Sequence, residues 1–207
     1  GGVVEAGDWT IYKHDERRSG YTAEEVPEQP ETAWVFEKGE WFSSPAVQNL
    51  MVFVGSSDWT LYALYAYNGK EAWSFKTGGE VYAPTIADSK VYLGSADGSV
   101  YCLNQENGEN LWSFSTGDAI RSSPLVLGTY VYVVSTDNYL YVLDTANGSL
   151  VSTINLGAMV TSSPVAYENS IFVTTWDGKV HAINSQTMTT KWVKQLTAQG
   201  MLENYAI

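Results

Sequence analysis

The chain has 207 residues, of which 44% are apolar and 14% aromatic, and its 23 acidic and 11 basic residues give a formal net charge of -12. An apolar fraction of this size supports a buried core and is not typical of a disordered chain. The negative charge argues against nucleic acid and anionic membrane surfaces as partners. The one cysteine, Cys102, excludes an intrachain disulfide and a thiolate metal cluster.

The first segment, residues 1–32, is predicted to be an acidic lead-in to the folded domain. Ten of the 23 acidic residues fall within the first 40 positions, among them Glu24 and Glu25 before Pro27. This composition is typical of a solvated linker, and a contact arm for a basic partner is the alternative. The segment lacks the basic region and long apolar core of a signal peptide, which leaves open whether a signal or anchor was removed. No apolar run reaches the length of about 18 residues that a membrane-spanning helix needs, so membrane insertion is not expected.

A repeat of 39 to 40 residues organises the remaining domain, residues 33–207. Four prolines and four aspartates each recur at spacings of 39, 40 and 40. They are Pro45, Pro84, Pro124 and Pro164, and Asp58, Asp97, Asp137 and Asp177. Markers that share one phase indicate four copies of one structural unit, near residues 43–81, 82–121, 122–161 and 162–201.

Each unit is predicted to contain four short antiparallel strands. In residues 120–156, four apolar and aromatic runs are separated by turn residues. Asp97-Gly98 and Asn107-Gly108 are strong hairpin signals, because both central residues of a type I′ turn need positive φ. Such a unit cannot bury both faces alone, and stacking units around an axis covers them. The predicted fold class is therefore an all-β propeller of four-stranded antiparallel blades, either four-bladed or a part or half of a larger ring.

The two ends of the repeat array raise the question of how the ring is completed. Val151 replaces the repeated tryptophan in the third unit. In the fourth unit Thr187-Met188 replaces Asn-Gly and Trp192 comes late, so the last blade is expected to be irregular. Five candidate outer strands, the first at residues 34–37, accompany four sets of inner strands. The ring could close with four blades, the chain could be part of a larger propeller, or two copies could combine as a homo-oligomer. The spare outer strand favours the last two arrangements.

Residues 83–117, from Ala83-Pro84 through Asp97-Gly98 to Trp112, resemble the repeat of the pyrroloquinoline quinone (PQQ)-like propeller family. The resemblance extends over nearly the whole chain. It implies a β-propeller fold and one of two branches. One branch contains dehydrogenases that bind PQQ and calcium and oxidise alcohols or sugars. The other contains non-enzymatic scaffolds, such as the propeller lipoprotein of the outer-membrane barrel assembly machinery.

The residues favour the scaffold branch. Cys102 alone cannot form the adjacent-cysteine disulfide that the resemblance would imply for a dehydrogenase. The repeated aspartates are expected to bond their own turns. His14 and His181 make no metal motif, and His181 is expected to fill a strand position that holds tyrosine in the other units. We therefore predict no catalytic residue, no cofactor and no metal, with PQQ and calcium as the alternative that no residue supports.

Five aromatic residues are candidates for a ligand or partner surface: Trp41, Trp59, Tyr82, Tyr139 and Trp176. Each stands where the other units usually carry a smaller or different residue, and a position outside the repeat pattern is available for binding. The predicted function is a non-catalytic binding or scaffold module for a protein partner, at the cell surface or in the periplasm. The alternatives are a fragment of a PQQ-dependent alcohol or sugar dehydrogenase, and a carbohydrate-binding propeller.

Overall fold

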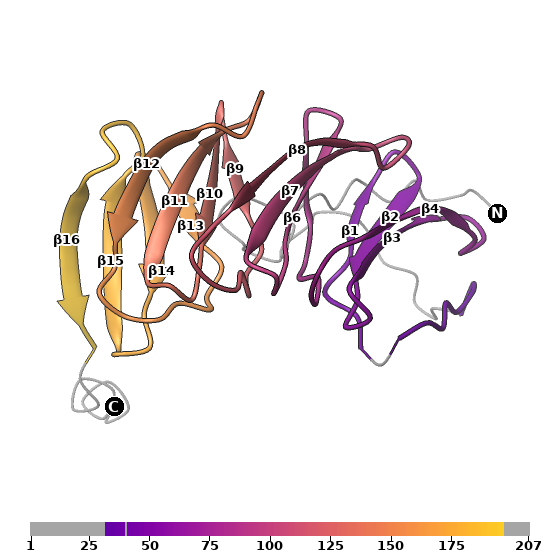
Figure 1. The fold of residues 1–207 in the computed structure, drawn as a ribbon, viewed down its shortest axis with the longest axis horizontal. Coiled ribbons are helices and arrows are strands. Elements are labelled where there is room, and N and C mark those ends of the chain that lie inside the picture. The colour runs from indigo at the N-terminus through magenta and orange to yellow at the C-terminus, as the bar shows by residue number, and fades with distance from the viewer. Residues whose placement is uncertain (1–31, 40, 197–207) are drawn as a thin grey trace, which may run out of the picture.

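The computed structural model describes residues 32–39 and 41–196, which fold into four antiparallel sheets of four strands each (Figure 1). In every sheet the strands lie in chain order, so each sheet is one blade. This confirms the predicted all-β fold class. The described residues contain no helix that could span a membrane. Of the predicted lead-in, only Thr32 lies within the described residues.

The strand bounds repeat closely from blade to blade. Blade 1 consists of β1 (Ala46–Gln48), β2 (Met51–Gly55), β3 (Thr60–Tyr65) and β4 (Glu71–Lys76). Blade 2 consists of β5 (Thr85–Ala87), β6 (Lys90–Gly94), β7 (Ser99–Asn104) and β8 (Asn110–Ser115). Blade 3 consists of β9 (Leu125–Leu127), β10 (Tyr130–Val134), β11 (Tyr139–Asp144) and β12 (Leu150–Asn155). Blade 4 consists of β13 (Val165–Tyr167), β14 (Ser170–Thr174), β15 (Lys179–Asn184) and β16 (Thr190–Gln195).

Two of the repeated aspartates hold the hairpin turns of blades 2 and 3 to their own blade and to the blade before it. Asp97 accepts hydrogen bonds from the Ser99 N–H and the Tyr101 hydroxyl, both at 2.8 Å. It also accepts one from the N–H of Gly78, in the linker that leaves blade 1, at 2.7 Å. Asp137 makes the same three contacts in blade 3. The predicted local role of these aspartates is confirmed for both turns, and each carboxylate also joins two blades.

Three of the repeated tryptophans pack against the blade that follows them in the chain. Each indole covers the glycine of the Asn-Gly turn in the following blade, so closely that a Cβ atom on Gly69 would lie 2.5 Å from the ring of Trp34. Each indole N–H also donates to a backbone carbonyl of that blade, at 2.7 to 3.2 Å. The pairs are Trp34 on Gly69, Trp73 on Gly108 and Trp112 on Gly148. Glycine suits these positions because their φ values are positive and the indole leaves no room for a side chain.

The joint between blades 3 and 4 replaces both partners of this contact. Ser152 occupies the tryptophan position on β12, because it pairs with Val142 as Trp112 pairs with Cys102. The predicted replacement by Val151 is therefore wrong by one residue. Met188 occupies the glycine position with a φ of 57°. Met188 packs against the hydrophobic cluster shared by blades 3 and 4. A small polar side chain is thus matched with a long flexible one. The expectation of an irregular last blade is wrong, because β13 to β16 pair in the same register as the strands of the other blades.

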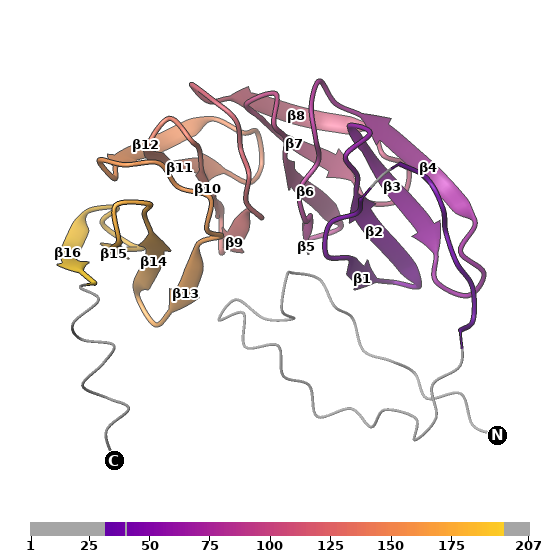
Figure 2. The ribbon, with the colours of Figure 1, turned by 90° about the horizontal axis from the view of Figure 1, so that it is seen from below.

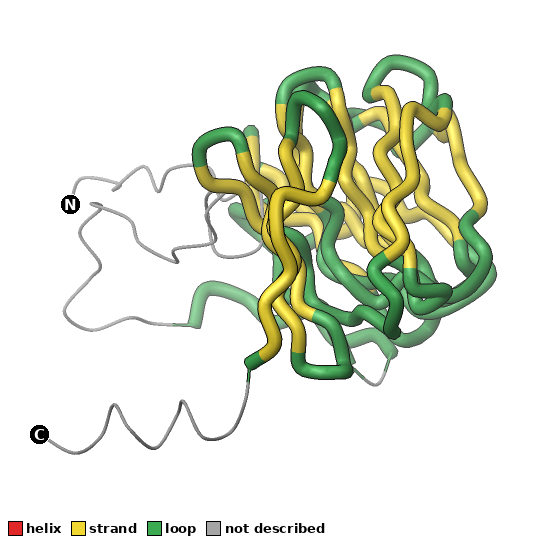
Figure 3. Tube along the Cα trace, turned by 90° about the vertical axis from the view of Figure 1, so that its left-hand side faces the viewer, coloured by secondary structure: helices red, strands yellow, loops and turns green. Residues whose placement is uncertain are grey.

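The four blades fan along an open arc (Figure 2). The innermost strands β1, β5, β9 and β13 converge on the inside of the arc, each packed beside the next, and the outermost strands form its rim. The hydrophobic clusters fill the spaces between successive blades. Blade 4 forms one end, where β16 is exposed along its whole length (Figure 3). The described residues therefore form part of a ring rather than a closed one.

Candidate partner-binding surface

The linkers that enter the four blades meet at the inside of the arc and surround a cavity of about 220 Å³. Trp41 and Ser43 precede β1, Tyr82 precedes β5, Arg121 precedes β9 and Ser163 precedes β13. All four blades therefore contribute to this cavity. We call the group formed by Trp41, Tyr82, Arg121 and the adjacent Glu80 the axial cluster.

The axial cluster is a connected set of aromatic and charged groups. The rings of Trp41 and Tyr82 lie 5.8 Å apart at 53°. The Arg121 guanidinium donates a 2.7 Å hydrogen bond to the Tyr82 hydroxyl oxygen, and this hydroxyl lies 3.2 Å from a Glu80 carboxylate oxygen. Partial burial raises the pKa of Tyr82 above its usual value, so the hydroxyl stays protonated.

The ion pair in this cluster contributes little to folding. Arg121 and Glu80 approach to 3.5 Å, and their side chains are 45% and 36% exposed. Exposed pairs of this kind are worth only about 0–1 kcal/mol. Tryptophan, tyrosine and arginine are the residues most enriched at the energetic centres of protein interfaces. The axial cluster is thus chemically suited to contact another protein.

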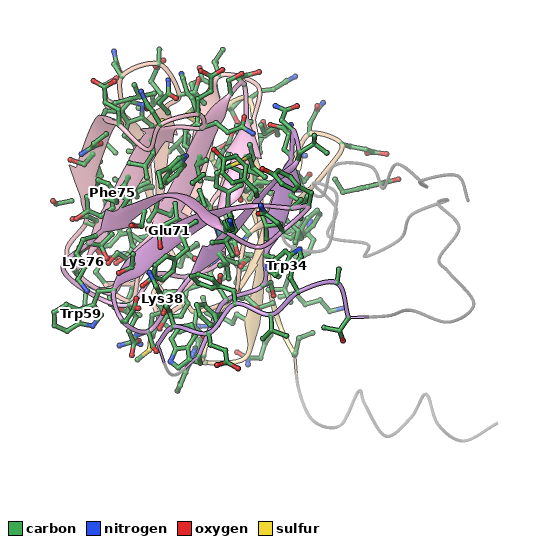
Figure 4. The ribbon with its side chains drawn as sticks, turned by 90° about the vertical axis from the view of Figure 1, so that its right-hand side faces the viewer. Trp34, Lys38, Trp59, Glu71, Phe75 and Lys76 are labelled. Carbon is green, nitrogen blue, oxygen red and sulfur yellow. The ribbon has the colours of Figure 1, made fainter. Side chains whose placement is uncertain are left out.

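Trp59 lies in the β2–β3 turn beside Lys76 (Figure 4) and does not line the axial cavity. Its φ is 71°, at a position that holds Gly98 and Asn138 in the next two blades, and its side chain is 48% exposed. The ammonium of Lys76 lies 5.5 Å from the Trp59 ring centre and donates to the Asp58 carbonyl. A bulky residue in left-handed backbone is strained, and this contact holds it in place.

The other two predicted residues lie in other blades. Tyr139, on β11, receives a 3.2 Å hydrogen bond from Asn155 and packs 6.3 Å from Tyr141. Trp176, in the β14–β15 turn, is 69% exposed and donates its indole N–H to the Thr161 hydroxyl at 3.0 Å. Of the five predicted residues, the structure therefore brings Trp41 and Tyr82 together.

Sequence reasoning missed Arg121 and Glu80. Arg121 stands directly before Ser122-Ser123-Pro124, in the linker that corresponds to the one carrying Tyr82. A search for charged residues beside the repeated proline would have found it. Glu80 could not be assigned in this way, because its place beside Tyr82 depends on how the linker bends.

The described residues do not fit the calcium site of a PQQ enzyme. No group of three or more histidine, cysteine, aspartate or glutamate side chains comes together among them. Calcium takes six to eight oxygen ligands, carboxylates prominent among them, and Glu80 is the carboxylate beside the axial cavity. Cys102 is buried, and burial raises the pKa of its thiol to about 11, so it is not a reactive thiolate.

His181 is a packed strand residue on β15. Its side chain is 5% exposed, and its Nε2 atom lies 3.5 Å from the Thr175 hydroxyl. Burial lowers the pKa of the imidazole, so it is neutral at neutral pH. It therefore occupies the strand position that Tyr62, Tyr101 and Tyr141 fill in the other blades, as the sequence indicates.

Comparison with protein families assigns the fold to a known group. The model of a family described as outer membrane protein assembly factor BamB matches residues 10–127 and 96–205. The chain belongs to this family of PQQ-like propellers. A comparison with curated protein sequences gives no match.

Solved structures of both branches resemble the chain. BamB from Moraxella catarrhalis is 20% identical with a TM-score of 0.62, over 71% of this chain and 50% of that protein. Quinohemoprotein alcohol dehydrogenase from Comamonas testosteroni is 15% identical with a TM-score of 0.79, over 92% of this chain and 41% of the enzyme. The computationally designed Ika4 protein is 19% identical with a TM-score of 0.69, over 75% of this chain and 99% of the design. The chain thus spans half or less of the two natural proteins, and these similarities establish the fold alone.

Proposed function

We propose that the chain is a non-catalytic propeller scaffold of the cell envelope that binds a protein partner through the axial cluster. The observation that supports this most is the grouping of Trp41, Tyr82 and Arg121 around a cavity to which all four blades contribute. None of these three residues belongs to the repeat that packs the blades together. Membership of the BamB family supports an envelope location and a protein partner.

The proposal predicts that replacing the side chains of the axial cluster by alanine abolishes the binding of one partner protein. Tagged wild-type protein is cross-linked in an envelope extract of the source cells, beside the double variant Trp41→Ala and Arg121→Ala. Tyr67→Ala is the matched control, because Tyr67 is 71% exposed and lies in the β3–β4 turn, at the other end of the blades. We expect wild type and control to retain the same protein and the double variant to lose it. Retention by the double variant would contradict the proposal.

We also propose that another propeller blade covers the outer face of blade 4 in the complete assembly. Trp192 on β16 is 47% exposed, whereas Trp34, Trp73 and Trp112 each cover a glycine of the following blade. A second copy of the chain is one source of such a blade, which gives a homo-oligomer. Light scattering at several concentrations measures this: a dimer mass supports the homo-oligomer, and a monomer at all concentrations contradicts it.

A PQQ-dependent dehydrogenase is the second candidate function. The similarity to the Comamonas enzyme, which extends over 92% of this chain, favours it. Titration with PQQ and Ca²⁺ tests this reading, with quenching of tryptophan fluorescence as the signal. Saturable binding together with dye-linked alcohol oxidation would replace the scaffold proposal.

A further inference from the structure

A second cavity lies at the other end of the blades, between blades 1 and 2. Because the strands alternate in direction, the β1–β2 and β3–β4 turns lie at the end opposite the linkers that form the axial cluster. The cavity has a volume of about 380 Å³. Met51 and Tyr65 line it from blade 1, and Ser89, Gln105 and Glu106 line it from blade 2. A volume near 400 Å³ is in the range of small-molecule sites.

Gln105 is the unusual residue of this cavity. Its side chain is 3% exposed, and both atoms of its amide are buried without a hydrogen-bond partner in the part of the chain that the structure describes. An amide offers two N–H donors and one carbonyl acceptor, and burying these groups unpaired is unfavourable. A buried amide without partners is rare in folded proteins and requires an explanation.

Blade packing does not require this amide. The Gln105 backbone makes the contacts of the position: its N–H donates to the Ser89 carbonyl at 3.1 Å, and its carbonyl accepts the Trp73 indole N–H at 3.1 Å. Ala66 and Thr145 make the same two backbone contacts in blades 1 and 3 with smaller side chains. The glutamine side chain is therefore an addition of blade 2 that the joint between the blades does not need.

The remaining lining indicates the chemistry of a ligand. Tyr65 is 40% exposed and presents an aromatic ring, while Met51 adds apolar surface. Ser89 and Glu106 supply further hydrogen-bonding groups, and the lining contains a carboxylate but no cation, so an anionic ligand is disfavoured. The lining combines turn residues, among them Ser89 and Gln105, with the ends of β2 and β3.

We infer that this cavity binds a neutral pyranose sugar, whose hydroxyl groups pair with the Gln105 amide. A pyranose has apolar C–H faces that can stack on Tyr65. Its adjacent hydroxyls each donate and accept, as the two ends of the amide do. Glu106 and Ser89 then complete the hydrogen bonding at the open side of the cavity. Because both amide atoms are buried, binding requires the Gln105 side chain to turn toward the cavity.

Two measurements on Gln105→Met test the inference. Methionine has a similar length and no amide. The variant should therefore lose ligand binding, and it should no longer carry the free-energy cost of a buried amide without hydrogen bonds. We expect saturation-transfer NMR to detect binding of at least one methyl glycoside of glucose, mannose, galactose or N-acetylglucosamine to wild type. In Gln105→Met this binding should weaken about tenfold or more, while the Tm rises by about 2–4 °C. Binding of the corresponding di- and trisaccharides, measured in the same way, distinguishes a glycan chain from a free monosaccharide as the ligand.

The matched control is Gln186→Met, which changes an exposed amide in the corresponding turn of blade 4. It should bind the glycosides as wild type does. If Gln105→Met does not fold, Gln105→Thr, which carries the residue that blade 3 has at this position, replaces it in both measurements. Failure of every glycoside to bind wild type would overturn the inference, as would undiminished binding by the variant. A lower Tm would also overturn it, because the amide would then be satisfied by structural water.

Discussion

Gly148→Ala is expected to destabilise the joint between blades 2 and 3. The residue has a φ of 71°, and an added Cβ atom would lie 2.6 Å from Cδ2 of Trp112, which is 8% exposed. Alanine in left-handed backbone costs about 1–2 kcal/mol, and overpacking a rigid indole adds about 1–3 kcal/mol. The expected loss is about 3 kcal/mol, or a Tm lower by about 6–12 °C for a chain of this size.

Gly128→Ala separates the two contributions. Gly128 has a φ of 60°, but nothing lies within 4 Å of the position that its Cβ would take. This control should therefore lose only the backbone contribution of about 1–2 kcal/mol. Urea unfolding, followed by tryptophan fluorescence, measures both variants against wild type. A red shift of the folded-state emission in Gly148→Ala alone would report that Trp112 has moved toward solvent.

The double variant Gly148→Ala and Trp112→Val completes the test. Removing the indole also removes the clash, so the two changes together should cost less than the sum of the single variants. Equal destabilisation by Gly148→Ala and Gly128→Ala would refute the steric reasoning. Strict additivity in the double variant would refute it as well.

Three further predictions concern the turns and the buried imidazole. Burial lowers the pKa of His181 below 6.5, so just below that pH the unfolded chain binds more protons than the folded one. The free energy of unfolding should therefore decrease as the pH is lowered through this range. His181→Tyr should remove this dependence in urea titrations. Burial and the 2.6 Å bond to Asp137 raise the pKa of Tyr141 to about 12, so Asp137→Asn should lower this pKa in ultraviolet titrations referenced to Tyr141→Phe. The same change should cost about 1–3 kcal/mol in unfolding, because it weakens the bond to the Gly117 N–H as well. Trp59→Gly should raise the Tm by about 2–4 °C, because glycine adopts positive φ without strain; a lower Tm would show that the contact with Lys76 outweighs the strain.

The sequence predicts the fold because the repeat makes each local signal agree with the others. Proline, aspartate and Asn-Gly recur in one phase, and each determines a strand start or a turn. The expected irregularity of blade 4 failed for a physical reason. The missing tryptophan on β12 and Met188 read as two separate departures, yet Ser152 and Met188 occupy the two halves of one contact position. Only the register of neighbouring blades reveals that one replacement accompanies the other.

The candidate sites were less predictable than the fold. Trp41 and Tyr82 could be selected as aromatic residues outside the repeat pattern, but their pairing with Arg121 depends on how three linkers converge. No sequence pattern indicates that Gln105 is buried, because a glutamine in a turn is usually exposed to solvent. Its burial arises from the neighbouring blade, which a single unit of the sequence does not describe.

The joint formed at Ser152 and Met188 gives the blades a fixed order. Blades joined by tryptophan and glycine present equivalent surfaces, so their units could in principle be exchanged during evolution or by design. A unit ending in tryptophan cannot be followed by blade 4, because Met188 fills the space that the indole needs. Blade 4 therefore accepts only a neighbour that carries a small residue at that position. A repeat array that grew by duplication has in this way acquired a joint that fixes which units can be neighbours.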